Sequence, residues 1–260
     1  MAAVERTDDG GVCRLRLNRP DKLNALNEDV RSALAAAFDE LRDRPDIKVV
    51  VLEGEGTAFS AGADLSGSGL GRGGSVDWAT RRHVFGSWGR LLDVMETVPQ
   101  VTVAKLHHHV IGGASLLAVA CDLRIAADDV KIRIPELAIG IPLTWGGVPR
   151  LAREIGLPLA RDLVLTGRTM LADEARACGF VQRVAPRAAL EDATDALVAE
   201  LVAMPAAPLA ITRAMFTAIG RERTGAAGWA DPDLLMWSGM EPESRDAAVD
   251  YVSSRLAKGS

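Results

Sequence analysis

Apolar residues near the N-terminus recur first with a period of two and then with a period of nearly four. Cys13, Leu15 and Leu17 alternate with polar residues, which predicts a strand with one solvated face. The next apolar residues, at spacings of four, four and three, are Val30, Leu34, Phe38 and Leu41. This spacing predicts an amphipathic helix, and Asn27 just before it is a residue type that caps helix N-termini.

Continuous apolar runs later in the chain predict strands that are buried on both faces. These runs, at residues 47–52, 101–106 and 123–127, alternate with helical patterns such as residues 112–120. Alternating strands and helices are typical of an α/β fold. From about Pro186 the pattern is helical, with helices expected at residues 188–203, 208–219 and 244–257. We therefore expect a core of residues 1–185 and a C-terminal helical segment of residues 186–260.

Composition and charge are those of a globular protein whose surface is slightly acidic. Hydrophobic residues make up 48% of the 260 residues, and the formal net charge is −5. This balance argues against nucleic acid or an anionic membrane as the main partner. The first ten residues are charged, and the apolar run at residues 110–121 is too short to span a bilayer, so we expect a cytoplasmic protein. The three cysteines, Cys13, Cys121 and Cys178, are interpreted as buried apolar residues rather than disulfides or metal ligands.

Two motifs invite a functional interpretation that their sequence context argues against. The glycine-rich stretch at residues 67–75 is not followed by Lys-Ser or Lys-Thr, so it is interpreted as a flexible surface loop and not as a P-loop. His107, His108 and His109 are consecutive at the end of a predicted strand. Consecutive strand residues point to opposite faces, which favours structural roles over a shared metal ion.

Two segments share one design, in which an apolar strand leads through a turn of small residues into the start of a helix. They are residues 58–65 and residues 110–117. Small residues let a ligand approach the backbone, and the first N–H groups of a helix have no intrahelical partner. Two such donors aimed at one point would form an oxyanion hole. Close packing of strand on helix explains either segment equally well when it is taken alone.

Five motifs in order resemble the signatures of the crotonase (enoyl-CoA hydratase/isomerase) superfamily. They lie at residues 18–26, 59–65, 112–122, 135–140 and 166–175. The resemblance extends over about residues 10–220. It implies a spiral of ββα units with a C-terminal helical layer, and an acyl-CoA thioester as substrate. It also implies that the C-terminal segment covers the site and mediates assembly into a homotrimer or homohexamer.

The resemblance assigns roles to residues of the first small-residue turn and to its counterpart. The backbone N–H groups of Ala63 and Gly113 would hold the thioester oxygen. Ala61 would face the adenine end of coenzyme A, while Asp64 and Leu65 would line the thioester channel. Support of the helix start is an alternative role for Asp64.

Lys22 and Leu23 match positions beside the nucleotide of coenzyme A. Lys22 is expected to meet phosphate, although a solvated lysine in a loop is an equally good interpretation. No metal ion and no separate cofactor are expected, because coenzyme A is part of the substrate.

The acid–base residues depart from the hydratase pattern. Hydratases of this superfamily use two glutamates; the second matches Glu136, but the position of the first is occupied by Leu116. Isomerases of the superfamily are similar in having leucine and glutamate at these positions. Residues 140–147 depart from the usual glycine-rich motif, since Thr144 and Trp145 bring a hydroxyl and bulk close to the expected acyl group. Trp145 either shapes the pocket or packs beneath the loop. Thr144 is expected to cap the following helix, and positioning a water molecule is its alternative role.

These observations favour an enzyme that moves a double bond of an unsaturated acyl-CoA with Glu136 as its single base. The first alternative is an enoyl-CoA hydratase whose water is held by groups other than a carboxylate. The second alternative is a non-catalytic protein that binds CoA thioesters.

Overall fold

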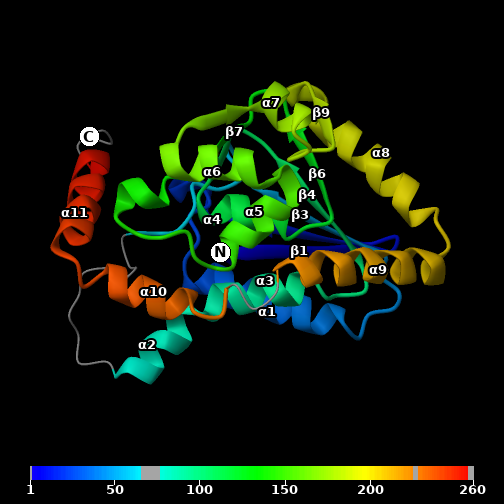
Figure 1. Ribbon diagram of the computed structural model, residues 1–260. Coiled ribbons are helices and arrows are strands. Elements are labelled where there is room, and N and C mark those ends of the chain that lie inside the picture. The colour runs from blue at the N-terminus through cyan, green and yellow to red at the C-terminus, as the bar shows by residue number, and fades with distance from the viewer. Residues whose placement is uncertain (1, 66–76, 225–227, 257–260) are drawn as a thin grey trace.

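The computed structural model describes residues 2–65, 77–224 and 228–256 (Figure 1). The glycine-rich segment at residues 67–75, interpreted above as a loop, lies outside these described residues. The strands are β1 (Val4–Asp9), β2 (Val12–Leu17), β3 (Val49–Gly54), β4 (Val101–Leu106), β5 (His109–Ile111), β6 (Leu123–Ala127), β7 (Lys131–Arg133), β8 (Thr169–Leu171) and β9 (Arg183–Ala185). They form a six-stranded sheet in the order β1-β2-β3-β4-β6-β9 and a three-stranded sheet in the order β5-β7-β8.

The helices occupy the connections between strands and most of the C-terminal part. They are α1 (Glu28–Leu41), α2 (Trp78–Phe85), α3 (Ser87–Met95), α4 (Gly113–Val119), α5 (Gly147–Ile155), α6 (Leu157–Thr166), α7 (Ala172–Ala177), α8 (Leu190–Val202), α9 (Ala206–Thr224), α10 (Asp231–Ser238) and α11 (Pro242–Leu256). Short 3₁₀ helices are η1 (Pro20–Lys22), η2 (Glu136–Ile139) and η3 (Arg187–Ala189).

Helix α1 begins and packs as its sequence predicts. The Oδ1 atom of Asn27 accepts a hydrogen bond of 3.0 Å from the amide of Val30, which satisfies one of the free N–H groups of the first turn. The four apolar residues of the predicted stripe, from Val30 to Leu41, are all buried. The predicted strand over residues 13–17 is β2, whose residues alternate between half-buried and buried.

The large sheet is buried on both faces because its central strands are mostly apolar. Strands β2, β3, β4, β6 and β9 pair in parallel, and β1 is antiparallel to β2. Since side chains alternate along a strand, Val50 and Leu52 join the main core on one face, whereas Val49 and Val51 pack with α8 on the other. The predicted α/β class is confirmed, and the apolar runs correspond to β3, β4 and β6.

The C-terminal part contains one helix more than the pattern predicted, and this helix lies next to α2 (Figure 1). Helix α10 is joined to α2 by a salt bridge of 3.0 Å between Arg82 and Asp233. Arg82 therefore holds α10 against α2. Cys13 and Cys121 are buried and unbridged as expected, but Cys178 is only half-buried.

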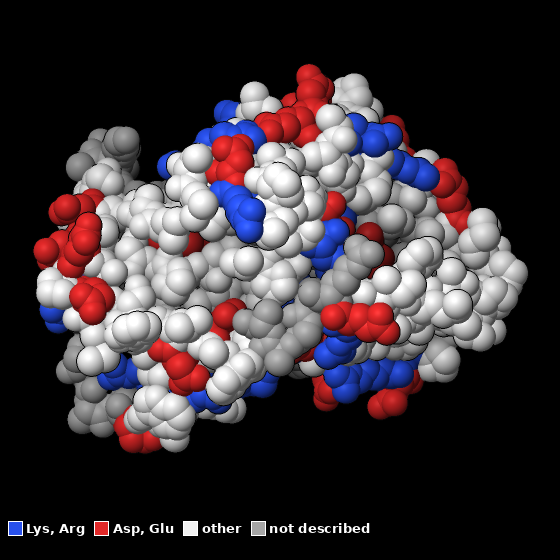
Figure 2. All heavy atoms as spheres, in the orientation of Figure 1, with Lys and Arg blue, Asp and Glu red and all other residues white. Residues whose placement is uncertain are grey.

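Surface character differs between the two ends of the molecule. Acidic residues gather over α11 at one edge, whereas uncharged surface dominates over α9 at the other (Figure 2). On α9, Phe216 is 71% exposed, and Ile211 and Met215 are each 62% exposed. Among the described residues no single helix is long and apolar enough to cross a membrane. Residues 187–202 and 206–222 together have the length and composition for it, but the two helices are bent by 106°.

Candidate active site

The loop after β2 is fixed by the side chain of a buried asparagine. Asn24 adopts φ 54°, a left-handed conformation that asparagine tolerates better than most residues. Its Oδ1 atom accepts from the amide of Arg19 at 2.9 Å, and its Nδ2 atom donates to the carbonyls of Glu55 and Ala58 at 2.8 and 2.9 Å. Asn24 thus ties the loop to the chain that follows β3.

The same loop pairs with residues 61–64. The amide of Ala61 donates to the carbonyl of Leu23 at 2.8 Å. Leu26 donates to Gly62 at 2.8 Å and accepts from Asp64 at 2.9 Å. Ala63 lies between these two bonds, opposite Leu26 in a parallel bridge. Because a parallel bridge uses the groups on either side of the central residue, the N–H of Ala63 is directed away from Leu26.

Residues 60–62 also pair on their other side, with the chain that enters α4. The amide of Ser60 donates to the carbonyl of His109 at 3.0 Å, and Ile111 donates to Ser60 at 3.2 Å. A Cβ atom on Gly62, which has φ 84°, would overlap the carbonyl of Ile111. Glycine at this position therefore permits the close approach that brings Ala63 and Gly113 to one cavity.

Gly113 begins α4, so its amide has no partner within the helix. The preceding Gly112 has φ 54°, and its amide donates to the carbonyl of Arg133 at 2.8 Å. A Cβ atom on Gly112 would lie 2.5 Å from Oε1 of Glu136. The Glu136 carboxyl group therefore lies against the backbone directly before the Gly113 amide.

Glu136 is a buried acid at the start of η2. Its side chain is 9% exposed, and its Oε2 atom is buried with no hydrogen-bond partner. Burial raises the pKa of Glu136 to about 7, opposed by a smaller effect of its own backbone amide. The other acids that line the cavity differ, since Asp64 forms an ion pair of 2.9 Å with Arg19 and Glu28 is hydrogen-bonded to Arg31.

These groups surround a cavity of about 540 Å³. Its lining residues are Arg19, Leu26, Asn27, Glu28, Ala63, Asp64, Leu65, Val84, Phe85, Ser87, Trp88, Gly113, Leu116, Glu136, Ile141, Leu143, Thr144, Trp145 and Leu235. Seven of the ten residues singled out from the sequence belong to this set. Lys22, Leu23 and Ala61 lie outside it: Lys22 is exposed on η1, and Leu23 is joined to Ala61 by the backbone hydrogen bond described above.

Trp145 forms part of the cavity wall. Its indole stacks on that of Trp88 with 4.8 Å between ring centroids and 11° between planes. A Cβ atom on Gly113 would overlap the six-membered ring of Trp145, so the indole lies directly against Gly113. Thr144 also lines the cavity, but the expectation that it caps the next helix is wrong, because α5 begins after Gly146 with no side-chain cap.

Several lining residues were not singled out from the sequence, among them Arg19, Trp88 and Leu235. Trp88 lies one turn before the buried Leu91 and Leu92 on α3, and this helical spacing was the signal for it. Leu235 of α10 is only 8% exposed. It faces the cavity because α10 is folded back by Arg82, a contact that the sequence pattern does not reveal.

The histidine triplet lies outside the cavity lining. His107 is 2% exposed, and its Nε2 atom lies 3.2 Å from the carbonyl of Gly56. Burial lowers the pKa of His107 to about 4, so its ring is neutral at physiological pH. Within the described ranges, no group of three or more His, Cys, Asp or Glu residues is arranged to hold a metal ion.

Comparison with known proteins supports the resemblance noted in the sequence. Residues 7–245 match the enoyl-CoA hydratase/isomerase family. A probable enoyl-CoA hydratase of Mycobacterium bovis is 40% identical over 70% of this chain and 68% of its own length. The human mitochondrial Delta(3,5)-Delta(2,4)-dienoyl-CoA isomerase is 33% identical over 73% of this chain and 60% of its own length.

Solved structures show the same fold. An enoyl-CoA hydratase from Mycobacterium avium subsp. paratuberculosis superimposes with a TM-score of 0.87 at 25% identity, covering 98% of this chain and 97% of its own. A putative enoyl-CoA hydratase from Thermobifida fusca in complex with CoA gives a TM-score of 0.77 at 31% identity, covering 99% of this chain and 95% of its own. The chain therefore belongs to the enoyl-CoA hydratase/isomerase (crotonase) superfamily, as an enzyme of acyl-CoA thioesters.

Proposed function

We propose that this enzyme moves the double bond of a 3-enoyl-CoA into conjugation with the thioester, with Glu136 as its single base. The observation that carries the proposal is the buried Glu136 carboxyl group, whose Oε2 atom has no partner and which lies against Gly112. A carboxyl group in that setting is available to exchange a proton with a substrate. Leu116 lines the same cavity, but its side chain can neither donate nor accept a proton.

The proposed reaction balances with one carboxylate. Glu136 takes a proton from C2, and the electrons of that C–H bond form an enolate conjugated with the double bond between C3 and C4. Glu136 then returns the proton to C4, and the new double bond forms between C2 and C3. A pKa of about 7 suits this exchange, because the carboxylate is a stronger base than a solvated one and is still ionised near neutral pH.

The enolate oxygen would accept hydrogen bonds from the amides of Ala63 and Gly113. Both residues line the cavity, and neither amide is used within the loop bridge or the helix, as described above. Removing one comparable donor in other enzymes costs about 3 kcal/mol of transition-state stabilisation. A carboxylate can remove a proton from the α-carbon of a thioester only when hydrogen bonds stabilise the negative charge on the enolate oxygen.

A hydratase is the second candidate. The Mycobacterium bovis relative has a name that supports it, and Thr144 supplies a hydroxyl group in the cavity that would hold a water molecule near Glu136. Hydration would then depend on one carboxylate in place of two. The buried Leu116 argues against it, since an apolar side chain offers water no hydrogen bond.

The rest of the ligand would extend from the cavity toward the surface near Lys22, Leu23 and Ala61. The Thermobifida fusca structure in complex with CoA supports this class of ligand. Lys22 is exposed at the end of η1, where its ammonium group would meet phosphate. A cytoplasmic location, a homotrimer or homohexamer, and a C-terminal segment at residues 186–260 that mediates assembly remain parts of the proposal.

The test is a panel of 3-enoyl-CoA and crotonyl-CoA esters, assayed for double-bond movement and for addition of water. We expect the wild-type enzyme to convert the 3-enoyl esters, and Glu136→Gln to lose at least about a hundred-fold in kcat/KM. Glu28→Gln is the matched control, because this second glutamate lines the same cavity and is expected to leave the rate unchanged.

Other outcomes would contradict the proposal. Rapid hydration of crotonyl-CoA by the wild type, without movement of the 3-enoyl double bond, would favour the hydratase. Tight binding of the esters with no turnover would favour the non-catalytic alternative.

A further inference from the structure

Three aromatic residues line the cavity: Phe85, Trp88 and Trp145. We call these three residues the aromatic wall. Trp88 and Trp145 are stacked nearly parallel, so each indole covers one face of the other and keeps its second face free of that partner. Because the Trp145 ring lies against Gly113, the wall runs beside the amide that is proposed to hold the thioester oxygen. The first carbons of any acyl group bound there would pass along it.

The Trp145 backbone is held in an unfavourable conformation. Its φ is 61°, in the left-handed region that residues with bulky side chains rarely adopt. Its carbonyl accepts a hydrogen bond of 2.6 Å from Arg150, and the next amide, of Gly146, donates to Asp231 of α10 at 2.7 Å. Strained backbone of this kind persists only where its surroundings impose it, and it clusters at ligand sites.

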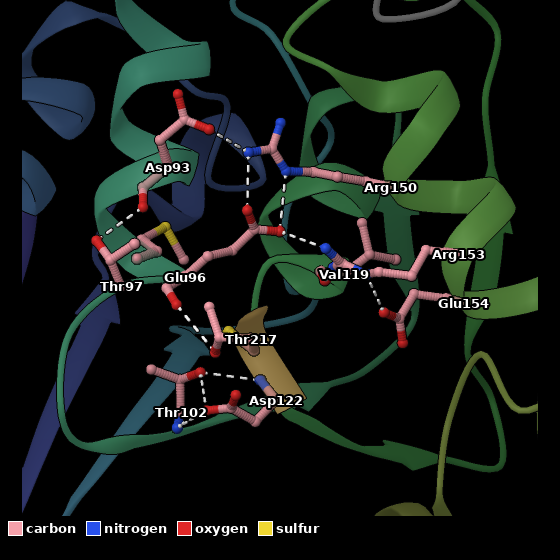
Figure 3. A network of polar contacts seen from close by, with 12 residues as sticks. Asp93, Glu96, Thr97, Thr102, Val119, Asp122, Arg150, Arg153, Glu154 and Thr217 are labelled. Atoms are coloured by element: carbon pink, nitrogen blue, oxygen red, sulfur yellow. Dashed lines mark hydrogen bonds and ion pairs between the residues drawn. The ribbon is translucent and has the colours of Figure 1, made fainter. Parts of the chain in front are cut away.

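Arg150 itself is fixed by a buried ionic network that extends from α3 to α5. Figure 3 shows its guanidinium group between Asp93, at 2.7 Å, and Glu96, at 3.0 Å. Arg153 binds the same Glu96 carboxylate at 3.0 Å from the next turn of α5. Since Arg150 is only 6% exposed and is bound on both sides, it holds the Trp145 carbonyl in one place. The wall is therefore preorganised.

We propose that the aromatic wall selects acyl-CoA esters whose acyl group is flat close to the thioester, such as an aryl ring or a conjugated diene. A flat π-system that extends this stack gains contact with an outer indole face over its whole area, whereas a puckered ring or a branched chain touches that face at a few atoms. Stacked aromatic pairs contribute beyond the area that they bury, which corresponds to roughly two- to ten-fold in affinity. The proposal rests on the proposed function only in using the same cavity for the acyl group.

The test compares two esters with the same carbon skeleton, phenylacetyl-CoA and cyclohexylacetyl-CoA. Neither has a chain double bond to move, so binding is measured by calorimetry without turnover. The cyclohexyl ring is the more hydrophobic of the two, so a cavity that selected ligands by hydrophobicity alone would prefer cyclohexylacetyl-CoA. We expect the wild type to bind phenylacetyl-CoA roughly two- to ten-fold more tightly.

Variants assign any preference to the wall. Trp88→Leu and Trp145→Leu are expected to abolish the preference, and Trp88→Phe to restore most of it. Trp237→Leu is the matched control, because this tryptophan is 65% exposed on α10 and does not line the cavity. Thermal unfolding checks that each variant is folded. If Trp145→Leu does not fold, Trp88→Leu alone is enough to test the role of the wall, because Trp88 lies in an ordinary helical conformation.

Equal affinity of the wild type for both esters, or a preference that survives in Trp88→Leu, would overturn the proposal. A wild type that moves double bonds but shows no preference refutes this inference alone. A wild type that prefers the phenyl ester but moves no double bond refutes the proposed function alone. Failure to bind either ester would also refute this inference, and the 3-enoyl-CoA panel would still test the proposed function separately.

Discussion

The buried Glu136 carboxyl group should make the enzyme less stable at the pH at which it works. Its pKa is raised from 4.5 to about 7, so the folded state binds the proton more tightly than the unfolded chain does. The sign follows from proton linkage: the stabilisation from this proton is complete below pH 4.5 and is lost as the pH rises through 7. Above pH 7 the folded protein carries an ionised carboxylate that would be better solvated in the unfolded chain.

The magnitude follows from the two pKa values. A shift of about 2.5 units corresponds to about 3 kcal/mol at pH 8 and to less than about 1 kcal/mol at pH 5. Glutamine at position 136 has nearly the same shape and no charge at any pH. Its amide also needs hydrogen-bond partners, so part of the gain is offset equally at both pH values. We therefore expect Glu136→Gln to gain about 2 kcal/mol in relative stability between pH 5 and pH 8.

The assay is urea unfolding of the wild type and Glu136→Gln at pH 5 and pH 8, at one protein concentration so that any assembly contributes equally. Glu222→Gln on α9 is the matched control, because this glutamate is exposed. Its stability relative to the wild type should be the same at both pH values. In parallel, kcat/KM of the wild type should fall about ten-fold per pH unit below pH 7, since the base must be ionised.

A stability difference between wild type and Glu136→Gln that does not change with pH would refute the reasoning. The carboxyl group would then be solvated in the folded state, and the wild-type rate should also stay level down to about pH 5. The two measurements are independent, because one follows unfolding and the other follows turnover. If both measurements change near pH 7, the carboxyl group whose ionisation destabilises the folded protein is also the base of the reaction.

Two further substitutions test the geometry around Glu136. Gly112→Ala should lower kcat/KM about a hundred-fold, because its Cβ atom would lie 2.5 Å from Oε1 of Glu136 and displace the base. Gly10→Ala is its control, since Gly10 has nearly the same φ, 55°, with nothing within 4 Å; equal activity of both variants would contradict the contact. Leu116→Glu should raise hydration of crotonyl-CoA at least about ten-fold by supplying a second carboxylate. Leu116→Gln should not do so, and an equal rise in both would show that charge at this position is unimportant.

The parts of the fold that the sequence predicted are those decided by local chemistry. The alternation in β2 and the stripe of α1 with its Asn27 cap both depend on residues within a few positions of one another. Helix α10 was missed because the contacts of Asp231 and Asp233 that hold it reach residues far away in the sequence. The place of Leu235 in the cavity lining could not be predicted for the same reason, since it depends on where α10 docks.

The site was only partly accessible from the sequence. Residues 58–65 and 110–117 were recognisable as turns of small residues, and the resemblance to a family assigned the amides of Ala63 and Gly113. What brings the two turns together is the pairing of Ser60 between His109 and Ile111, which no periodicity encodes. The carboxyl group of Glu136 was identified by its motif, but its burial depends on the whole cavity.

Local rules of stability are broken at two places around this one cavity. Trp145 has a left-handed backbone, and Glu136 is a buried acid without a partner for Oε2. Departures of this kind cost of order 1–3 kcal/mol each. Selection for stability alone would remove them, and a glutamine at position 136 would be the simplest change. Their presence around a cavity of acyl-group size is what selection for ligand binding and proton transfer would maintain, so variants that relieve them should gain stability and lose activity together.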